Sequence, residues 1–250
     1  MRTLPLIGCS LYVLAAAASA TTTAHVLSGG SLSQNWSAIG LITANDDWSG
    51  IPSIMGYRGD DATAGTGVDP STLIADYSAV TDVNANQTAP NTFVTGGVTE
   101  FHLADPVVAL TGSGTADAPN LVLYLDATGM QAITINYDLF DIDGSADNSV
   151  QPVALQYRLG GTGNYNNLSM VTDASSGPSL TGAAIPVSAV LPFGADNQSL
   201  VEIRILTTNA VGNDEWIGVD NISVSATPIP EPASAGLFAL AGMAMLRRRR

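Results

Sequence analysis

Acidic side chains at metal-ligand spacing are the most distinctive chemical feature of this 250-residue chain. Asp141 and Asp143 are followed by Gly144 and, three residues later, by Asp147, so hard oxygen donors share one tight turn, as calcium requires. The order departs from the EF-hand loop, which needs a ligand at position five and Glu at position twelve. Asp220, in the last predicted strand, is expected to close beside this turn. We therefore predict a structural calcium site at Asp141, Asp143 and Asp220.

The same residues also have a simpler interpretation. Asp-Gly is a favoured two-residue hairpin turn, so Asp143 and Gly144 could connect two strands without binding an ion. Both alternatives stay open at this point. No other cofactor is indicated.

Aromatic side chains in predicted loops are the second candidate. Trp48 and Tyr165 lie in loops of a β-rich chain, where an exposed ring could stack on a sugar. The same rings could instead cap the core of the domain. Trp216 begins a strongly apolar strand and is expected to be buried. Trp48 and Tyr165 are thus the predicted carbohydrate contacts.

Catalytic residues are not assembled anywhere in the sequence. The two histidines, His25 and His102, are far apart, and no nucleophile elbow, zinc-protease motif or phosphate-binding glycine loop is present. A glycosidase needs two carboxyl groups on one face, but no strand carries such a pattern. Asp214 and Glu215, expected at a turn, are the residues on which a secreted hydrolase would depend. We predict that the chain is not an enzyme.

Short strands separated by turns must position these groups. In residues 131–140 the apolar Ile133, Ile135, Tyr137 and Leu139 alternate with polar residues, which gives one buried and one solvated face. Roughly ten strands are predicted, with no helical period between them. The best defined are 37–43, 98–103, 107–111, 120–125, 131–140, 150–159, 199–206 and 216–226. One helical turn is predicted after an Asp69 cap, with Pro70 in its first position.

This pattern predicts an all-β, antiparallel β-sandwich in residues 21–226. The segment 214–224, with Gly218, Asp220, Asn221 and Ile222, resembles the closing strand of concanavalin-like, lectin-type sandwiches. That resemblance implies a jelly roll.

The first twenty residues have the order of a secretory signal peptide, with Arg2 before an apolar stretch at 11–18 and a small-x-small end. Signal peptidase is expected to cut between Ala20 and Thr21. Cys9 follows Leu-Ile-Gly, which looks like a lipoprotein box, so a lipid anchor is the alternative. Because Cys9 is the only cysteine, residues 21–226 contain no disulfide and no thiolate metal site.

The last 24 residues, 227–250, consist of a Pro-Glu-Pro turn, an uncharged run and an arginine tail. The run at 233–246 would span about 21 Å as a helix, against about 30 Å for a hydrocarbon core. We expect a hydrophobic helix that holds the chain transiently in the inner membrane, a terminal core helix being the alternative. The cytoplasmic flank would be Arg247, Arg248, Arg249 and Arg250.

This order of parts resembles the PEP-CTERM sorting signal of Gram-negative bacteria that make extracellular polysaccharide. The resemblance implies that an exosortase, a membrane-embedded cysteine transpeptidase-like enzyme, processes the chain at its Pro-Glu-Pro motif. The processing site would be Pro230, Glu231 and Pro232.

Charge restricts the partners further. Residues 21–226 hold 21 of the 22 acidic residues but only three of the eight basic ones, so their net charge is near −18. Such a surface repels nucleic acid. A solvated acidic coat and loose binding of divalent cations are both consistent with it. We expect a non-enzymatic protein of the cell surface or extracellular matrix, associated with exopolysaccharide. A carbohydrate-binding module is the alternative, and a secreted hydrolase is the third interpretation.

Overall fold

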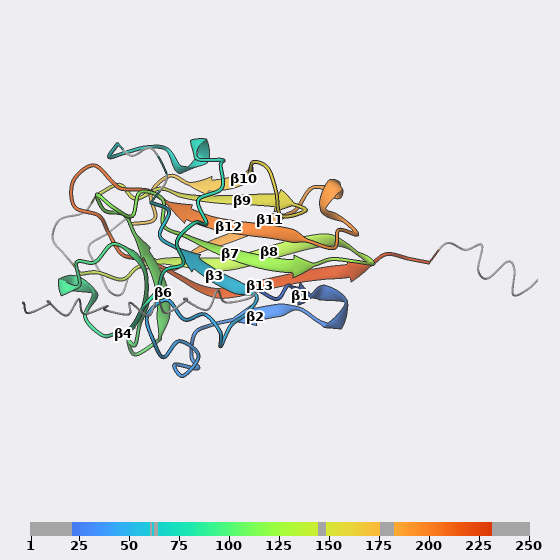
Figure 1. The fold of residues 1–250 in the computed structure, drawn as a ribbon, viewed down its shortest axis with the longest axis horizontal. Helices are drawn as coiled ribbons and strands as arrows, with labels where there is room; N and C mark the ends of the chain where they lie inside the picture. Colours follow the sequence, from blue (N-terminus) through green and yellow to red (C-terminus); the bar gives the residue numbers. More distant parts are fainter. Residues whose placement is uncertain (1–21, 61, 63–64, 145–148, 176–182, 232–250) are drawn as a thin grey trace, which may run out of the picture.

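The computed structural model describes residues 22–60, 62, 65–144, 149–175 and 183–231. In that part of the chain all regular structure other than short 3₁₀ turns is β-strand, arranged in two sheets (Figure 1). The 3₁₀ turns are η1 (Leu27–Gly29), η2 (Pro70–Thr72), η3 (Pro90–Thr92) and η4 (Phe193–Ala195). The prediction of an all-β sandwich is confirmed.

The first sheet has six strands in the order β1-β7-β12-β9-β10, with β3 also paired to β7. Its strands are β1 (His25–Val26), β3 (Ile54–Tyr57), β7 (Asn120–Asp126), β9 (Val153–Leu159), β10 (Asn166–Val171) and β12 (Val201–Thr207).

The second sheet has seven strands in the order β11-β8-β13-β6-β5-β4, with β2 also paired to β13. Its strands are β2 (Leu32–Gln34), β4 (Asn84–Gln87), β5 (Gly97–Phe101), β6 (Val107–Thr111), β8 (Met130–Asp141), β11 (Ile185–Val190) and β13 (Ile217–Pro228). Two pairs, β1 with β7 and β4 with β5, are parallel, so the sandwich is not purely antiparallel as expected.

One hydrophobic core joins the inner faces of the two sheets. Alternation places Ile133 and Ile135 of β8 inward, where they share a cluster with Leu123 of β7 and Ile203 of β12. All four side chains are fully buried. Burying a residue of this size contributes about 1.5–3 kcal/mol, so the inward faces of these strands account for much of the stability.

The longest strands, β8 and β13, have 12 residues each and pair antiparallel along the second sheet. Ile217 of β13 pairs with Asp141 of β8, and Pro228 pairs with Met130. The start of β13 and the end of β8 therefore lie at one end of the sandwich. Pro228 lies at the opposite end, from which residues 229–231 leave the domain (Figure 1).

The outer face of the first sheet is covered rather than solvated. Glu202 and Arg204 of β12 lie on the face opposite the core, yet both are buried. The loop that contains η2 covers them, since Arg204 donates to the carbonyls of Leu73 and Ala75. The predicted Asp69 cap is confirmed, because its side chain accepts from the Ser71 N–H.

Several expectations about elements are wrong. The strand predicted at 37–43 is irregular, and β2 forms instead at 32–34. The last strand begins one residue later and ends two residues later than predicted, at Pro228. The sequence pattern also missed β10 and β11, whose residues are mostly exposed or half-buried. Such edge strands lack the apolar alternation that marks a buried face.

The two terminal signals fall mainly outside the described residues. This holds for residues 1–21, with Ala20 and Thr21, and for 232–250, with Pro232 and the four terminal arginines. Pro230 and Glu231 are described, and both are exposed and outside any strand. Within the described ranges no helix has the length and apolarity needed to cross a membrane.

Candidate metal centre

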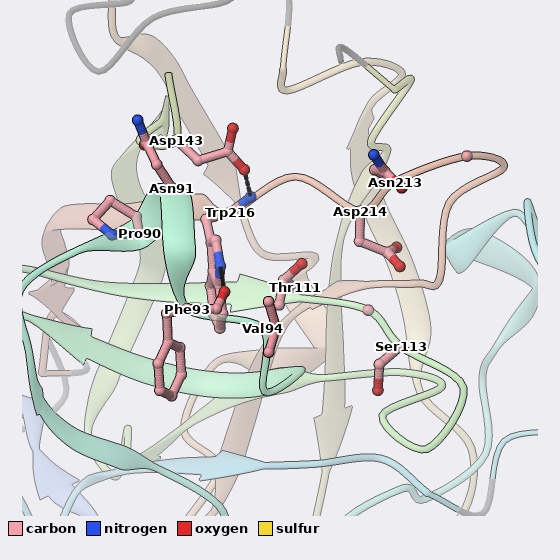
Figure 2. Close-up of a pocket in the computed structure, with 12 residues that line it drawn as sticks. Pro90, Asn91, Phe93, Val94, Thr111, Ser113, Asp143, Asn213, Asp214 and Trp216 are labelled. Atoms are coloured by element: carbon pink, nitrogen blue, oxygen red, sulfur yellow. Dashed lines mark hydrogen bonds between the residues drawn. The ribbon is translucent and has the colours of Figure 1, made fainter. Parts of the chain in front are cut away.

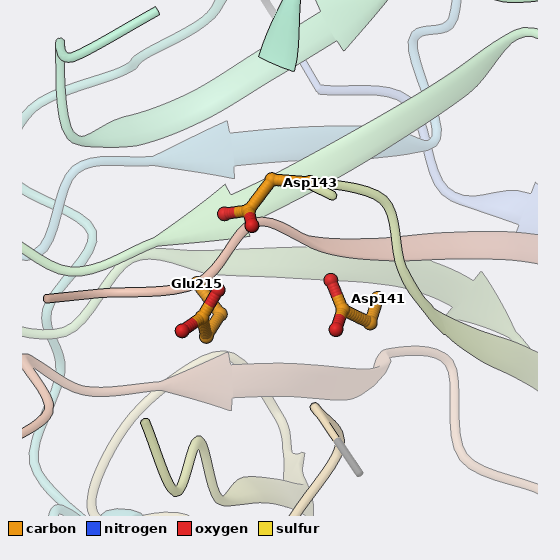
Figure 3. A group of neighbouring side chains, drawn as sticks. All are labelled: Asp141, Asp143 and Glu215. Carbon is orange, nitrogen blue, oxygen red and sulfur yellow. The ribbon is translucent and has the colours of Figure 1, made fainter. Parts of the chain in front are cut away.

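Three buried carboxylates meet at the end of the sandwich where β13 starts. Asp141, Asp143 and Glu215 each offer an oxygen atom, and these atoms all lie within 4.8 Å of one another (Figure 3). The three residues are 7%, 6% and 2% exposed. Among the described residues this is the group of acidic side chains whose geometry fits a cation.

Strand register explains the convergence. Asp141 pairs with Ile217, and in antiparallel strands the next pair on the same face combines the residue two after Asp141 with the residue two before Ile217. Those residues are Asp143 and Glu215. The ladder loosens here, because the Trp216 N–H donates to Oδ2 of Asp143, 3.2 Å away, while the Ile142 N–H still donates to the Trp216 carbonyl.

Backbone and amide groups hold the centre from the other side. The Ser149 N–H donates to Oε1 of Glu215 at 2.8 Å, and the Glu215 N–H donates to Oε1 of Gln151. The Gln151 amide in turn donates to Oγ1 of Thr207 and to the Thr208 carbonyl. Glu215 is thus fixed by segments from both sheets.

The electrostatics of the group favour a cation. Burial is the largest cause that raises the pKa of Glu215, to about 8. The Ser149 N–H opposes the rise, while a hydrogen bond with Asp143 and the charges of Asp143 and Asp141 add to it. Without a cation, a proton must therefore reside in the group at neutral pH.

Calcium fits these donors better than other common metals. Any two oxygens that each lie about 2.4 Å from one ion are at most about 4.8 Å apart, and the three carboxylate oxygens lie within 4.8 Å of one another. All three donors are hard carboxylates, with no histidine or cysteine among them, which argues against zinc or copper. Calcium takes six to eight oxygens, so backbone carbonyls or water would complete the shell.

Two of these three residues, Asp141 and Asp143, were predicted from the sequence. Asp220 was the wrong third partner, because it pairs with Asp138 and its side chain lies on the outer face of the sheet. Asp141 pairs with Ile217, whose side chain lies on the core face. The hairpin alternative for Asp143 and Gly144 is also wrong: β8 and β9 belong to different sheets, so this segment crosses between them. Asp147 lies outside the described residues.

A pocket of about 430 Å³ opens beside the centre, with Asp143 in its wall (Figure 2). Its apolar side is formed by Pro90, Phe93, Val94 and Trp216, and its polar side chains are Asn91, Thr111, Ser113, Asn213 and Asp214.

Trp216, in the apolar side of this pocket, is held in place by a hydrogen bond and by ring packing. The Trp216 Nε1–H donates to the Phe93 carbonyl, and the ring packs edge-on against Phe101, with centroids 5.0 Å apart. Val94 at the pocket is 92% exposed. The pocket therefore combines a rigid aromatic wall with polar side chains beside the carboxylates.

The rings predicted to contact carbohydrate are both buried, so that prediction is wrong. Trp48 is fully buried, and its indole N–H donates to the Asp82 carbonyl. Tyr165 is 2% exposed and donates to Glu202 at 2.6 Å. Loop composition suggested exposure, but these loops cover the core. Trp216 is buried as expected.

Tyr165 belongs to a buried polar network that the sequence did not reveal. Its ring lies against the guanidinium groups of Arg158 and Arg204, 4.4 and 3.8 Å from the ring centroid. Arg158 pairs with Glu202 and also with Asp76. Every cation here has its own partner, so the network serves to dock the η2 loop on the first sheet.

Comparison with known proteins gives structural similarities but no family match. No family model matches, and no curated protein matches. Among solved structures, the K3 cleaved adhesin domain of Lys-gingipain from Porphyromonas gingivalis w83 aligns with TM-score 0.43 and 13% identity over 78% of this chain and 98% of that one.

Two further structures align at similar levels. A Stig cyclase from Fischerella sp. TAU gives TM-score 0.41 and 15% identity over 80% of this chain and 100% of the other. A carbohydrate-binding module of family CBM28, described as specific for non-crystalline cellulose, gives TM-score 0.37 and 14% identity over 56% and 86%.

Proposed function

We propose that this chain is an exported, non-enzymatic surface domain whose β-sandwich binds calcium at Asp141, Asp143 and Glu215. The observation that carries the metal assignment is the convergence of three buried carboxylates within 4.8 Å. The ion would neutralise them and tie the segment after β8 to the segment before β13. This role is structural and not catalytic, because the ion would join two chain segments and would not activate a water molecule or a substrate.

The sequence signals supply the rest of the proposal. Signal peptidase would cut after Ala20, and an exosortase would process the chain at Pro230, Glu231 and Pro232, leaving the domain at the cell surface or in an exopolysaccharide layer. The exposure of Pro230 and Glu231 supports access for such an enzyme.

We assign the sandwich to the jelly-roll class. The strand orders β6-β13-β8-β11 and β7-β12-β9-β10 support this, because in each of them a strand from the set β6–β9 alternates with a strand from the set β10–β13.

Calorimetric titration of the metal-free protein with calcium tests the metal assignment. We expect heat of binding at a single site and a higher melting temperature in calcium than in chelator. Glu215→Gln should abolish both effects, while Asp220→Asn, on the opposite face of the sheet, should preserve them. Heat and stabilisation that survive in Glu215→Gln would reject the assignment.

Carbohydrate binding is the second candidate function, now assigned to the pocket beside the metal centre. The specific observation is the pairing of an apolar wall, which includes Phe93, with a polar wall, which includes Asn91 and Asp143, in one 430 Å³ pocket. Sugars offer the same combination of apolar faces and hydroxyl edges.

Affinity electrophoresis in polysaccharide gels tests this second function. Asn91 is exposed and accepts from the Gly144 N–H, so Asn91→Ala should reduce retardation by the gel. Asn35→Ala is the matched control, since Asn35 is also exposed and accepts from a backbone N–H, that of Ser37. Equal retardation of the two variants would count against sugar binding at this pocket.

A further inference from the structure

A second pocket, of about 440 Å³, lies on the outer face of the second sheet and is not part of the metal centre. It is lined by Leu103, Ala104, Asp105, Val107, Phe140, Ile142 and Asp220. The residues come from the β5–β6 connection, β6, the end of β8 and β13. A Cβ placed on Gly218 would meet Val107 and Ile142, whereas the neighbouring Ile217 and Val219 point into the main core, so the pocket lies on the other side of β13.

The carboxylate of Asp220 is the most unusual group in this pocket. The residue is only 2% exposed, yet its carboxylate accepts one hydrogen bond within the described part of the chain, from the N–H of the adjacent Asn221. A buried carboxylate ordinarily has several donors or a cation. Asp105, which also lines the pocket, is exposed. The side-chain amide of Asn221 donates to Asp138, the residue paired with Asp220, and not to Asp220 itself.

No basic side chain among the described residues lines the pocket. Each of the three arginines in the described residues has partners elsewhere. Arg58 pairs with Asp60, and Arg158 pairs with Glu202 and Asp76. Arg204 donates to Gln156 and to backbone carbonyls. His102 precedes Leu103 in sequence, but its Nε2 lies 3.1 Å from Glu100. Within the described residues, therefore, no positive charge compensates the negative charge of Asp220 and Asp105.

We propose that this pocket binds a protonated aliphatic amine, with the ammonium group against Asp220 and Asp105. An ammonium group carries three N–H donors on one nitrogen, which suits a carboxylate that lacks donors. The aliphatic body would pack on Leu103, Val107 and Phe140. A hydrated metal ion fits less well, because the remaining wall is apolar and calcium needs six or more oxygens.

The charge state of the pocket is compatible with this ligand. Burial is the largest cause that raises the pKa of Asp220, to about 6; the Asn221 N–H opposes the rise, and Asp105 and Asp138 add to it. Asp220 is thus mainly ionised near pH 7.5, where aliphatic amines are protonated.

Titration of the whole protein with n-pentylammonium, followed by NMR shifts or calorimetry at pH 7.5, tests the proposal. The uncharged n-pentanol is the ligand control, and we expect it to bind at least about tenfold more weakly, since only the ammonium gains from the carboxylates. Nα-acetyl-lysine N-methylamide distinguishes a free amine from a lysine side chain of a partner as the source. Binding of n-pentylammonium or of Nα-acetyl-lysine N-methylamide supports the proposal. The one that binds more tightly shows whether the natural ligand is a free amine or a lysine side chain.

Two variants make the outcome decisive. Asp220→Asn keeps an oxygen for the Asn221 N–H and should weaken amine binding about tenfold or more. Asp105→Asn, in an exposed loop, should weaken it less and guards against misfolding of the first variant. Asp126→Asn is the control for net charge, because Asp126 lies at the end of β7, away from the pocket. Equal affinity for amine and alcohol, or unchanged affinity in both pocket variants, would overturn the proposal.

Discussion

We expect wild type to be more stable than the Glu215→Gln variant in calcium, and the variant to be more stable than wild type once calcium is removed at alkaline pH. Glutamine keeps the oxygen that accepts from the Ser149 N–H, but it removes one of three mutually repelling carboxylates. With calcium, wild type should be the more stable protein, because only its site is complete. In chelator at alkaline pH, the variant should be the more stable one.

The magnitudes follow from linkage. A ligand at about 100 times its Kd stabilises the folded state by about 2.7 kcal/mol, which for about 200 residues is about 5–11 °C in melting temperature. In chelator, the pKa of Glu215 in the folded state is about 8, against an ordinary 4.5. The folded state then binds more protons than the unfolded state between these values, so wild-type stability falls as pH rises through this range. Each unit of pKa difference corresponds to about 1.4 kcal/mol.

The assay is thermal unfolding of both proteins at pH 6 and pH 9, in calcium and in chelator. Asp214→Asn is the matched control, since Asp214 is the next residue and its asparagine can still accept from the Ala210 N–H. We expect the control to behave as wild type in its calcium response. If the Glu215→Gln variant gains as much from calcium as wild type, or if wild type in chelator loses no more stability than the variant on going to pH 9, the reasoning is refuted.

Three further predictions concern the scaffold and are checked by urea unfolding at neutral pH. Trp48→Ala should lower the free energy of unfolding by about 3–5 kcal/mol, because a fully buried indole is lost. It should leave calcium binding unchanged; a loss below 1 kcal/mol would mean that the ring is not in the core. Arg204→Ala should cost about 1–3 kcal/mol for each buried acceptor that it leaves without a donor, and it should expose the η2 loop to proteolysis, since the guanidinium donates to the carbonyls of Leu73 and Ala75; unchanged cleavage in that loop would contradict this role. Gly97→Ala should cost more than about 1 kcal/mol, because φ is +123° and the added Cβ would meet the Asp82 carboxylate. Gly114→Ala, with open space around it, is the control.

The sandwich was predictable where only one side of a strand contacts the hydrophobic core. Ile133 and Ile135 in β8, and Ile203 and Ile205 in β12, alternate with polar residues because only one face meets the core. In β10 no residue is fully buried, so its sequence carries no such signal. Trp48 was misplaced for a related reason: its loop has the composition of a surface segment, yet it covers the open edge of the core.

The metal centre was predictable from the sequence only in part. Asp141 and Asp143 are two residues apart, and their shared face can be read from local spacing. Glu215 is more than 70 residues away and joins them only through the pairing of Asp141 with Ile217. Once β8 and β13 are known to be neighbours, the alternation rule selects Glu215 and rejects Asp220. Local sequence cannot supply that neighbour relation, because it depends on the register of strands distant in the chain.

The direction of β13 has a mechanical consequence. Glu215 lies two residues before its first residue and Pro228 is its last, so a load applied between a ligand at the metal end and an attachment beyond Glu231 would pull along the strand. Its hydrogen bonds to β8 run across that direction and would be loaded together in shear, not peeled apart singly. Forced unfolding depends on the unfolding rate, and a cation that joins the β8 end to the β13 start would raise that barrier where the load enters. A domain tethered by its C-terminus to a cell surface under flow would therefore resist extension best when its metal centre is filled.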